Sequence, residues 1–429
     1  MDKSERARIV ALVKKQVVPA VGCTEPMAVA LCVAKAREVL GHEPQKVEVQ
    51  LSANILKNAM GVGIPGTGMT GLPIAVALGA IVGRSDYGLE VLKDVDEAAL
   101  QRGNAFVAED RIKITLKQNC CDKLYIETCV ECGDDRARAV IQGNHTHFVT
   151  VERNGTVLLS NENEDETDSG HDCNEMEWLT LRKVYEFATE APLEEICFID
   201  EAAVMNRNAA AESLKGNYGH ELGKTLSRPM GRGIMGDSMF SHIVSTTAAA
   251  CDARMAGAMV PVMSNSGSGN QGICATLPVV VFAEENHNTD EERTRALMLS
   301  HLTAIYMKQS LGCLSALCGC VVASTGSSVG ITYLMGGGYD QVCASVKNMV
   351  ANLTGMICDG AKPACALKLA SGVSTAVMSS LMAMQNKCVS SVEGIIDDCV
   401  DKSIHNLTRI GHDAMDETDR CVLEIMTHK

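Results

Sequence analysis

The chain has 429 residues, a formal net charge of −15 and a pI near 5.2. No cluster of Lys and Arg interleaves with aromatic residues, so we do not expect this acidic chain to bind nucleic acid. Apolar residues make up 46% of the sequence, which is ample for the cores of two or three domains. We therefore expect small molecules as partners, with a homodimer as one possible assembly.

Cysteine usage indicates a reducing compartment. The chain contains 19 cysteines, an odd number spread over its whole length. A chain of this size does not need disulfides for stability, so we expect free thiols. The opening MDKSERARIV is charged from its second residue and lacks the apolar stretch of an export signal. We therefore expect a cytoplasmic protein.

The first region is predicted to combine helices and strands. Apolar periodicity predicts helices over 5–17 and 26–40, joined as a helical hairpin. Alternation predicts a strand over 46–53, and the glycine-dense segment after it is typical of a functional loop. Further short alternating runs predict an antiparallel β meander. Its strands are expected over 111–117, 123–131, 136–143, 147–153 and 156–160.

The acidic, polar segment 161–177 is predicted to be a linker or loop. It divides an N-terminal α+β domain (1–160) from a mostly helical domain (178–429), so the fold class is α+β. Residues 309–339 carry no charged side chain, but glycines and serines interrupt them, which favours a buried helix over a membrane span. The other helices are expected over 179–190, 193–215, 237–258, 289–310, 340–355, 366–386 and 389–411.

Three cysteines near the C-terminal end form the most distinctive pattern in the chain. They are Cys318 in ALCGC, Cys358 in GMICDG and Cys365 in KPACALK. The last two lie seven residues apart across a Gly/Pro turn, and the first lies forty residues before Cys358. Three thiolates can hold an iron–sulfur cluster and leave one iron open as a Lewis acid. The spacing therefore favours a catalytic site over an electron carrier.

Other candidate residues lie in the N-terminal region. Cys23 precedes Pro26 at the start of a predicted helix, where unpaired N–H groups and the macrodipole stabilise a thiolate. It is therefore a candidate base or nucleophile, with a small buried apolar residue as the alternative. The polar side chains of Asn54, Lys57 and Asn58 adjoin the glycine-dense segment, which suits the binding of a substrate carboxylate.

A second glycine-rich segment, SNSGSGNQG, runs from Ser264 to Gly272 and leads to a further predicted helix. Its successive backbone N–H groups can form an anion nest, which again suits a carboxylate. Ser264, Asn265, Ser266 and Gly267 are the candidate substrate-binding residues here. The alternative is a flexible connector.

A competing metal site involves four cysteines of the β meander. Cys120, Cys121, Cys129 and Cys132 form a CC…CVEC pattern, and its CxxCG turn resembles a zinc knuckle. Adjacent strand residues point to opposite faces, so both members of the CC pair cannot easily bind one tetrahedral zinc. Free thiols are the favoured interpretation.

Taken together, these motifs resemble the L-cysteine desulfidase family, relatives of the alpha-chain type of iron–sulfur L-serine dehydratases. The resemblance is carried by GCTEP around Cys23, the glycine-rich run after Lys57, GNHTH at 143–147, SNSGSGNQG and the three-cysteine set. It extends from the first predicted helix to DETDRCVLEIM at 416–426.

The resemblance implies a [4Fe–4S] cluster held by Cys318, Cys358 and Cys365, with Cys320 as the neighbour that could replace Cys318. It implies Cys23 as proton acceptor, with both polar segments holding the substrate amine and carboxylate between the two regions. The family reaction converts L-cysteine to sulfide, ammonia and pyruvate without pyridoxal phosphate. L-Serine dehydration is the alternative of the same chemistry, and a zinc-binding or redox-sensing thiol protein is the alternative of another class.

Overall fold

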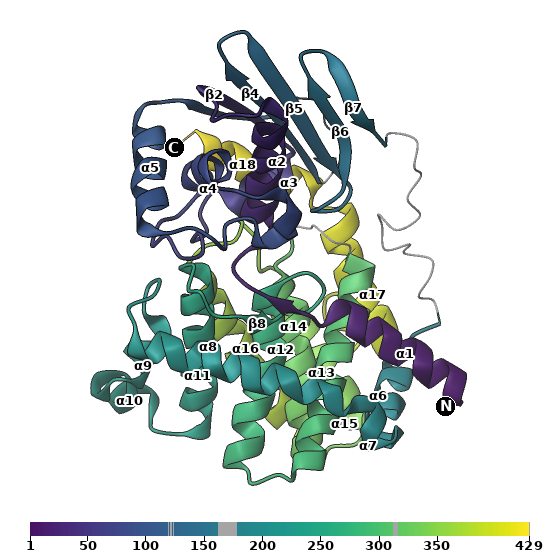
Figure 1. Ribbon diagram of the computed structural model, residues 1–429. Coiled ribbons are helices and arrows are strands. Elements are labelled where there is room, and N and C mark those ends of the chain that lie inside the picture. The colour runs from purple at the N-terminus through teal and green to yellow at the C-terminus, as the bar shows by residue number, and fades with distance from the viewer. Residues whose placement is uncertain (119, 121, 123, 162–177, 312–315, 429) are drawn as a thin grey trace.

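The computed structural model describes residues 1–429 except 119, 121, 123, 162–177, 312–315 and 429. A sheet with its covering helices is stacked on a larger helical region (Figure 1). The predicted α+β class, with strands in the N-terminal part and helices in the C-terminal part, is confirmed. Nearly all of the predicted linker, 161–177, lies outside the described residues.

Six strands form the sheet in the order β3-β2-β4-β5-β6-β7. The predicted antiparallel meander is confirmed for β4 to β7. The strand β3 does not join the meander, because it pairs in parallel with β2 at the opposite edge. A parallel pair needs a crossover, and the helices between β2 and β3 provide it. The strand bounds are β2 (Lys46–Leu51), β3 (Ile112–Leu116), β4 (Tyr125–Cys132), β5 (Asp135–Gln142), β6 (Phe148–Arg153) and β7 (Thr156–Ser160).

Helix α2 (Thr24–Leu40) packs between the sheet and helix α4 (Leu72–Ile81). Its residues from Pro26 to Ala34 are all buried, since they have the sheet on one side and α4 on the other. Gly79 of α4 permits this approach, because a Cβ there would lie 2.7 Å from the Ala30 carbonyl oxygen. The sequence pattern missed α4, which is apolar on every face and so shows no period. The region also contains α3 (Ala53–Ala59), η1 (Ser85–Glu90) and α5 (Glu97–Ala108).

The helical region is built around α14 (Gly319–Leu334), which packs against α12, α13, α15 and α16. The predicted buried helix in the uncharged segment is thus confirmed. The helix predicted over 389–411 begins only at Val400, because turns occupy the preceding residues. The other elements are α6 (Leu181–Glu190), α7 (Leu193–Ile196), η2 (Cys197–Ile199), α8 (Asp200–Lys215), α9 (Leu222–Ser227), α10 (Pro229–Met235), α11 (Met239–Met255), α12 (Gly269–Glu285), α13 (Asp290–Leu311), α15 (Tyr339–Leu353), α16 (Cys365–Met384) and α17 (Val400–Asp413).

Helix α16 is, among the described residues, long and apolar enough to cross a membrane by length and composition alone. In the structure it packs against α11, α14 and α15, and 56% of its most apolar 18-residue stretch is buried inside the protein. A core helix of a folded domain passes the same test, so this feature is weak evidence for a span.

The two ends of the chain pack on regions distant from them in sequence. Helix α1 (Lys3–Gln16) contributes Ile9 and Val13 to the core of the helical region. Helix α18 (Asp416–Thr427) contributes Leu423 to the core beneath the sheet. The predicted hairpin of the first two helices is therefore wrong, because the apolar residues of α1 and α2 enter different cores (Figure 1). The domain ranges predicted from the sequence also differ from these two cores at both ends.

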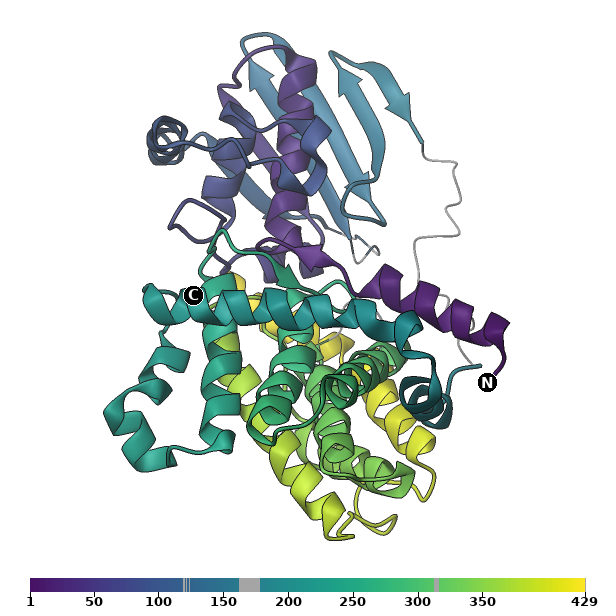
Figure 2. The same cartoon turned by 60° about the horizontal axis from the view of Figure 1, so that its bottom comes forward.

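A short ladder joins the two regions. Strand β1 (Pro19–Ala20) pairs antiparallel with β8 (Val262–Met263). The chain between α1 and α2 thus passes along the junction of the sheet region and the helical region (Figure 2). Gly63 lies against the backbone at the end of α11, where a Cβ would come within 2.2 Å of the Ala256 carbonyl carbon. The two regions are therefore in direct backbone contact.

The close packing of α2 on α4 predicts that Gly79→Ala destabilises the protein. The added methyl would clash with the Ala30 backbone, and overpacking of this kind costs about 1–3 kcal/mol. Gly233→Ala is the matched control, since Gly233 also lies in a helix and nothing lies within 4 Å of its Cβ position. The denaturation midpoint should fall for Gly79→Ala and stay level or rise for Gly233→Ala. Equal midpoints would contradict the packing.

Candidate active site

Two of the three cysteines of the predicted cluster lie at the starts of helices, and Cys358 lies in the segment between α15 and α16. Cys318 is the N-cap of α14, and Cys365 is the first residue of α16. Burial raises the pKa of the Cys318 thiol, and the nearby Cys320 and Cys358 raise it further. Burial also raises the pKa of Cys365, and Cys358 again contributes. The fold therefore brings Cys318, Cys358 and Cys365 into one electrostatic environment.

Backbone pairing fixes two of these cysteines relative to each other. Leu317 and Ile357 form an isolated antiparallel bridge. The Cys318 amide donates to the Met356 carbonyl at 2.9 Å. The Cys358 amide donates to the Ala316 carbonyl at 2.6 Å. These backbone bonds hold Cys318 and Cys358 close together although forty residues separate them in the sequence.

Two lysines supply positive charge beside the thiols. Lys368 and Lys362 both form ion pairs with Asp359. The distance from Lys362 Nζ to Asp359 Oδ1 is 2.6 Å. Burial works against protonation of Lys368, but Asp359 and the thiols of Cys318 and Cys358 outweigh it and raise its pKa. A charged lysine therefore lies within reach of any thiolate that forms here.

The donors gathered here are cysteine thiols, the ligand type of iron–sulfur clusters. Within the described part of the chain, no group of three or more His, Cys, Asp or Glu side chains is arranged to hold one metal ion. Each thiolate of a four-iron cluster binds a different iron, so its ligands lie farther apart than those of one ion. One buried and two half-buried thiols, two lysines and two helix N-termini suit a group with negative charge.

Cys320 faces a different environment from Cys318. Its Sγ lies 4.0 Å from the Sγ of Cys274 on α12 and donates to the Lys368 carbonyl at 3.3 Å. These contacts direct the Cys320 thiol into the core between α12 and α16. Cys318 therefore remains the preferred ligand of the two, as the sequence spacing predicts.

Cys23 is the N-cap of α2 and is 4% exposed. Its thiol donates to Oε2 of Glu25 at 2.9 Å. Burial raises the pKa of this thiol well above its ordinary value, and the negative charge of Glu25 adds to the effect. The direction is opposite to the one expected from the helix N-terminus alone, because desolvation and a carboxylate outweigh the dipole here. Burial and Glu25 therefore both favour the protonated form of the Cys23 thiol.

Glu25 connects several residues of the two regions. Asn58 Nδ2 and Thr24 Oγ1 each donate to its carboxylate at 3.2 Å. Burial opposes ionisation of Glu25, but His145, the Cys23 thiol and Arg254 outweigh it and lower its pKa. His145 belongs to the GNHTH motif, and Arg254 comes from α11 of the helical region. The site thus extends across the junction.

The polar residues predicted after β2 are largely engaged with protein groups. Lys57 is 3% exposed and forms an ion pair with Asp419 of α18. Asn58 is bound to Glu25. The Oδ1 atom of Asn54 is buried and has no hydrogen-bond partner among the described residues. Asn54 therefore keeps a buried acceptor without a protein partner among the described residues.

The loop from Ser264 to Gly272 is held by its own side chains. Ser264 Oγ donates to the Val18 carbonyl at 2.6 Å, and Asn265 Nδ2 donates to the carbonyl of buried His301 at 3.1 Å. Ser266 Oγ donates to Asn265 Oδ1 at 2.9 Å. Gly267 follows with a φ of +77°, a conformation that favours glycine. These hydrogen bonds anchor the loop, which favours the interpretation as a binding loop over the alternative of a flexible connector.

The far end of this loop carries residues that the sequence reasoning missed. Asn270 Oδ1 accepts from Arg254 Nη1 at 3.0 Å, and the side chain of Gln271 packs against Gly319, next to Cys318. GCTEP and GNHTH gave a local signal for Glu25 and His145. Arg254 had no such signal, because its neighbours are contributed by distant parts of the chain.

The CC…CVEC cysteines lie on or before β4. Cys129 and Cys132 are three residues apart on this strand, so they point to opposite faces of the sheet. Burial raises the pKa of Cys129. Cys121 lies outside the described residues, and the cysteines that are described belong to no set of three metal-ligating side chains.

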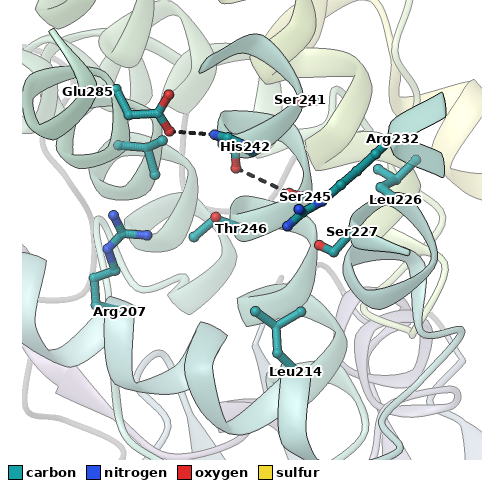
Figure 3. Close-up of a pocket in the computed structure, with 11 residues that line it drawn as sticks. Arg207, Leu214, Leu226, Ser227, Arg232, Ser241, His242, Ser245, Thr246 and Glu285 are labelled. Carbon is teal, nitrogen blue, oxygen red and sulfur yellow. Dashed lines mark hydrogen bonds and ion pairs between the residues drawn. The ribbon is translucent and has the colours of Figure 1, made fainter. Parts of the chain in front are cut away.

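A cavity of about 250 Å³ lies elsewhere in the helical region, between α8, α9, α11 and α12 (Figure 3). Arg207 and Arg232 extend towards it from opposite sides, and His242 is bound to Glu285 at 2.7 Å on its rim. Its charged groups are already paired, since Arg207 bonds Glu284 and Arg232 lies 3.6 Å from Asp237. None of the described residues that line it is a cysteine, so we place the reaction at the thiols.

The comparisons with known proteins identify a family for this chain. A family model described as the serine dehydratase alpha chain matches residues 86–424. A UPF0597 protein of Bacteroides fragilis is 65% identical over 429 residues, which is 100% of both chains. Another, from Bacteroides thetaiotaomicron, is 65% identical over 432 residues and covers 100% of this chain and 99% of the relative. A third, from Shewanella halifaxensis, is 44% identical over 426 residues and covers 97% of each.

The segment matched by the family model contains Cys318, Cys358, Cys365 and Arg254, whereas Cys23 lies before it. The roles of individual residues, and the choice between cysteine and serine as substrate, stay predictions. The chain belongs to the serine dehydratase alpha chain family of lyase-type enzymes, which generally depend on an iron–sulfur cluster.

Proposed function

We propose that this protein catalyses the [4Fe–4S]-dependent β-elimination of L-cysteine to sulfide, ammonia and pyruvate. The observation that supports the proposal is that two sets of groups are linked through Cys251 and Arg254 of α11. One set is the thiols of Cys318, Cys358 and Cys365 beside two lysines. The other is Cys23 with Glu25 at the start of α2.

Cys251 of α11 relates the two sets to each other. Burial and the neighbouring Cys365 raise the pKa of the Cys251 thiol, whereas Arg254 lowers it. Arg254 in turn acts on Cys23 and Glu25. Arg254 is therefore a neighbour of the candidate base and, through Cys251, is linked to the candidate cluster ligand Cys365.

When bound, a cluster with an open iron supplies a Lewis acid for the departing sulfur. Cys23 Sγ, as thiolate, takes the proton from the substrate Cα. The electron pair of that C–H bond forms the Cα=Cβ double bond, and the Cβ–S bond breaks with its electron pair on sulfur. The aminoacrylate that is released tautomerises and hydrolyses in water to pyruvate and ammonia. We expect this reaction in the cytoplasm, without nucleic acid or membrane partners and with a homodimer as a possible assembly.

L-Serine dehydration is the second candidate, and the family description favours it. Its elimination differs only in the departing atom, so the same residues would serve both substrates. A zinc-binding or redox-sensing thiol protein, the alternative of another class, predicts zinc in place of iron.

The cluster assignment predicts that Cys358→Ala abolishes both iron binding and product formation. Loss of one of three thiolates leaves the cluster without a required ligand. Cys388→Ala is the matched control, since Cys388 is an exposed free cysteine. After anaerobic reconstitution, iron content, visible absorption and pyruvate release from L-cysteine should collapse in the first variant only. A zinc-containing protein whose activity survives Cys358→Ala would contradict the cluster.

The base assignment predicts a different outcome for Cys23→Ala. This variant should keep the iron content of the wild type, because Cys23 is not among the proposed ligands. Its turnover should fall by about 10²–10⁴-fold, the usual loss when a general base is removed. Iron quantification and steady-state pyruvate release check both statements. Unchanged kcat would remove Cys23 from the mechanism and leave the lyase proposal standing.

The raised pKa of Cys23 predicts an alkaline dependence of kcat/KM. Only the thiolate accepts a proton, so kcat/KM should rise with pH until it passes the pKa of Cys23. Glu25→Gln removes the negative charge that helps raise this pKa. The pKa should fall, the thiolate fraction at a given pH should increase, and the rising limb should move to lower pH. A limb that stays in place or moves upward would show that another group controls the rate.

A further inference from the structure

We infer that Arg254, assisted by Gln271, binds the α-carboxylate of the substrate and sets its position between Cys23 and the cluster cysteines. The inference rests on the proposed amino-acid lyase function and deepens it by naming the residue that recognises the carboxylate. Gln271 lies in the loop from Ser264 to Gly272 that the sequence proposed for carboxylate binding, whereas Arg254 carried no sequence signal.

The guanidinium of Arg254 is a buried cation that forms no ion pair among the described residues, although the Glu25 carboxylate is near enough to feel its charge. Arg254 is 5% exposed, and its Nη1 donates to the neutral amide oxygen of Asn270. Within the described residues its Nε has no hydrogen-bond partner, and no Asp or Glu forms an ion pair with it. A buried charge left in this state is costly unless a ligand of opposite sign binds it. A carboxylate matches the fork geometry of an arginine.

Gln271 gives a second, independent indication of a ligand. It is 5% exposed, and within the described chain its Oε1 has no hydrogen-bond partner. Its side chain lies against Gly319, where a Cβ would approach within 2.8 Å of the amide carbon and nitrogen. Gly269 makes similar room for Arg254, since a Cβ there would lie 2.2 Å from Nε. Two glycines thus allow these side chains to lie at the starts of α12 and α14.

The position of Arg254 suits the reaction geometry. Its charge acts on Cys23 and Glu25 on one side and on Cys251, the neighbour of Cys365, on the other. The carboxylate is bonded to the carbon that loses its proton, so its anchor must lie close to the base. The helix N-termini that meet here add further positive potential.

The other candidate cations are already paired. Lys57, which the sequence favoured, forms an ion pair with Asp419. Arg207 at the separate cavity bonds Glu284, as described above. Arg254 therefore combines burial, an unpaired charge and proximity to Cys23, which neither of the others does.

The test compares Arg254→Gln and Arg254→Lys with the wild-type holoprotein on two substrates, L-cysteine and L-cysteinamide. For L-cysteine, Arg254→Gln should raise KM by about 100-fold or more, with a smaller effect on kcat, and Arg254→Lys should recover part of the loss. For the carboxamide, which has no anionic group, the variants should react like the wild type. Arg207→Gln, a variant of an arginine outside the site, should leave KM for L-cysteine unchanged.

Binding of L-alanine, which has no leaving group, separates this inference from the proposed function. Calorimetry on the holoprotein should show binding that Arg254→Gln weakens by about 100-fold. If the wild type turns over neither cysteine nor serine but binds L-alanine in this way, the lyase proposal fails and the carboxylate site stands. If Arg254→Gln binds L-alanine like the wild type, or loses both substrates equally, the carboxylate site is wrong.

Gln271→Leu and Arg254→Lys decide the matter if Arg254→Gln does not fold or does not take up iron. Each removes or alters one contact while keeping bulk at its position. We expect both to raise KM for L-cysteine relative to L-cysteinamide, with about a tenfold change for Gln271→Leu. An unchanged ratio of the two KM values in both variants would overturn the inference.

Discussion

The site depends on the short ladder between β1 and β8. Pairing of Pro19 with Met263 and of Ala20 with Val262 lays the segment before Cys23 alongside the segment that opens the loop from Ser264 to Gly272. Ser264 and Ser266 extend this contact, since their amides donate to Val18 and Gln16. The candidate base and the residues facing it thus come from two cores, and the backbone fixes their separation. The close approach of Gly63 to the end of α11 secures the same junction.

The electrostatic potential at this junction favours the binding of anionic ligands. Helices α2, α12, α14 and α16 begin there, and each contributes a partial positive charge. Arg254, Lys362 and Lys368 add full charges, while burial keeps the protein's own thiols neutral. A negatively charged cluster would interact favourably with Lys362 and Lys368, and a substrate carboxylate would interact favourably with Arg254. The raised pKa values of the thiols describe the site without its cluster and substrate, whose charges would change them.

Much of this structure could be predicted from the sequence. Alternation located all strands of the large sheet, and the spacing of Cys318, Cys358 and Cys365 picked out thiols that the fold brings together. Helix α4 was missed because an apolar helix has no period, but several other misses arise because local patterns do not say which core a segment joins. Helix α1 packs far from α2, β3 lies beyond β2, and Lys57 pairs with Asp419 from the other end of the chain. Arg254 was missed for the same reason, because its significance lies in the carboxylate partner it lacks.

The most direct test of the account is the product stoichiometry of the anaerobically reconstituted protein, supplied separately with L-cysteine and with L-serine. The account predicts sulfide and pyruvate in equal amounts from L-cysteine, with a higher kcat/KM than for L-serine. Pyruvate from L-serine alone would keep the family chemistry but contradict the desulfidase assignment. No product from either amino acid, despite a full complement of iron, would contradict the lyase proposal itself.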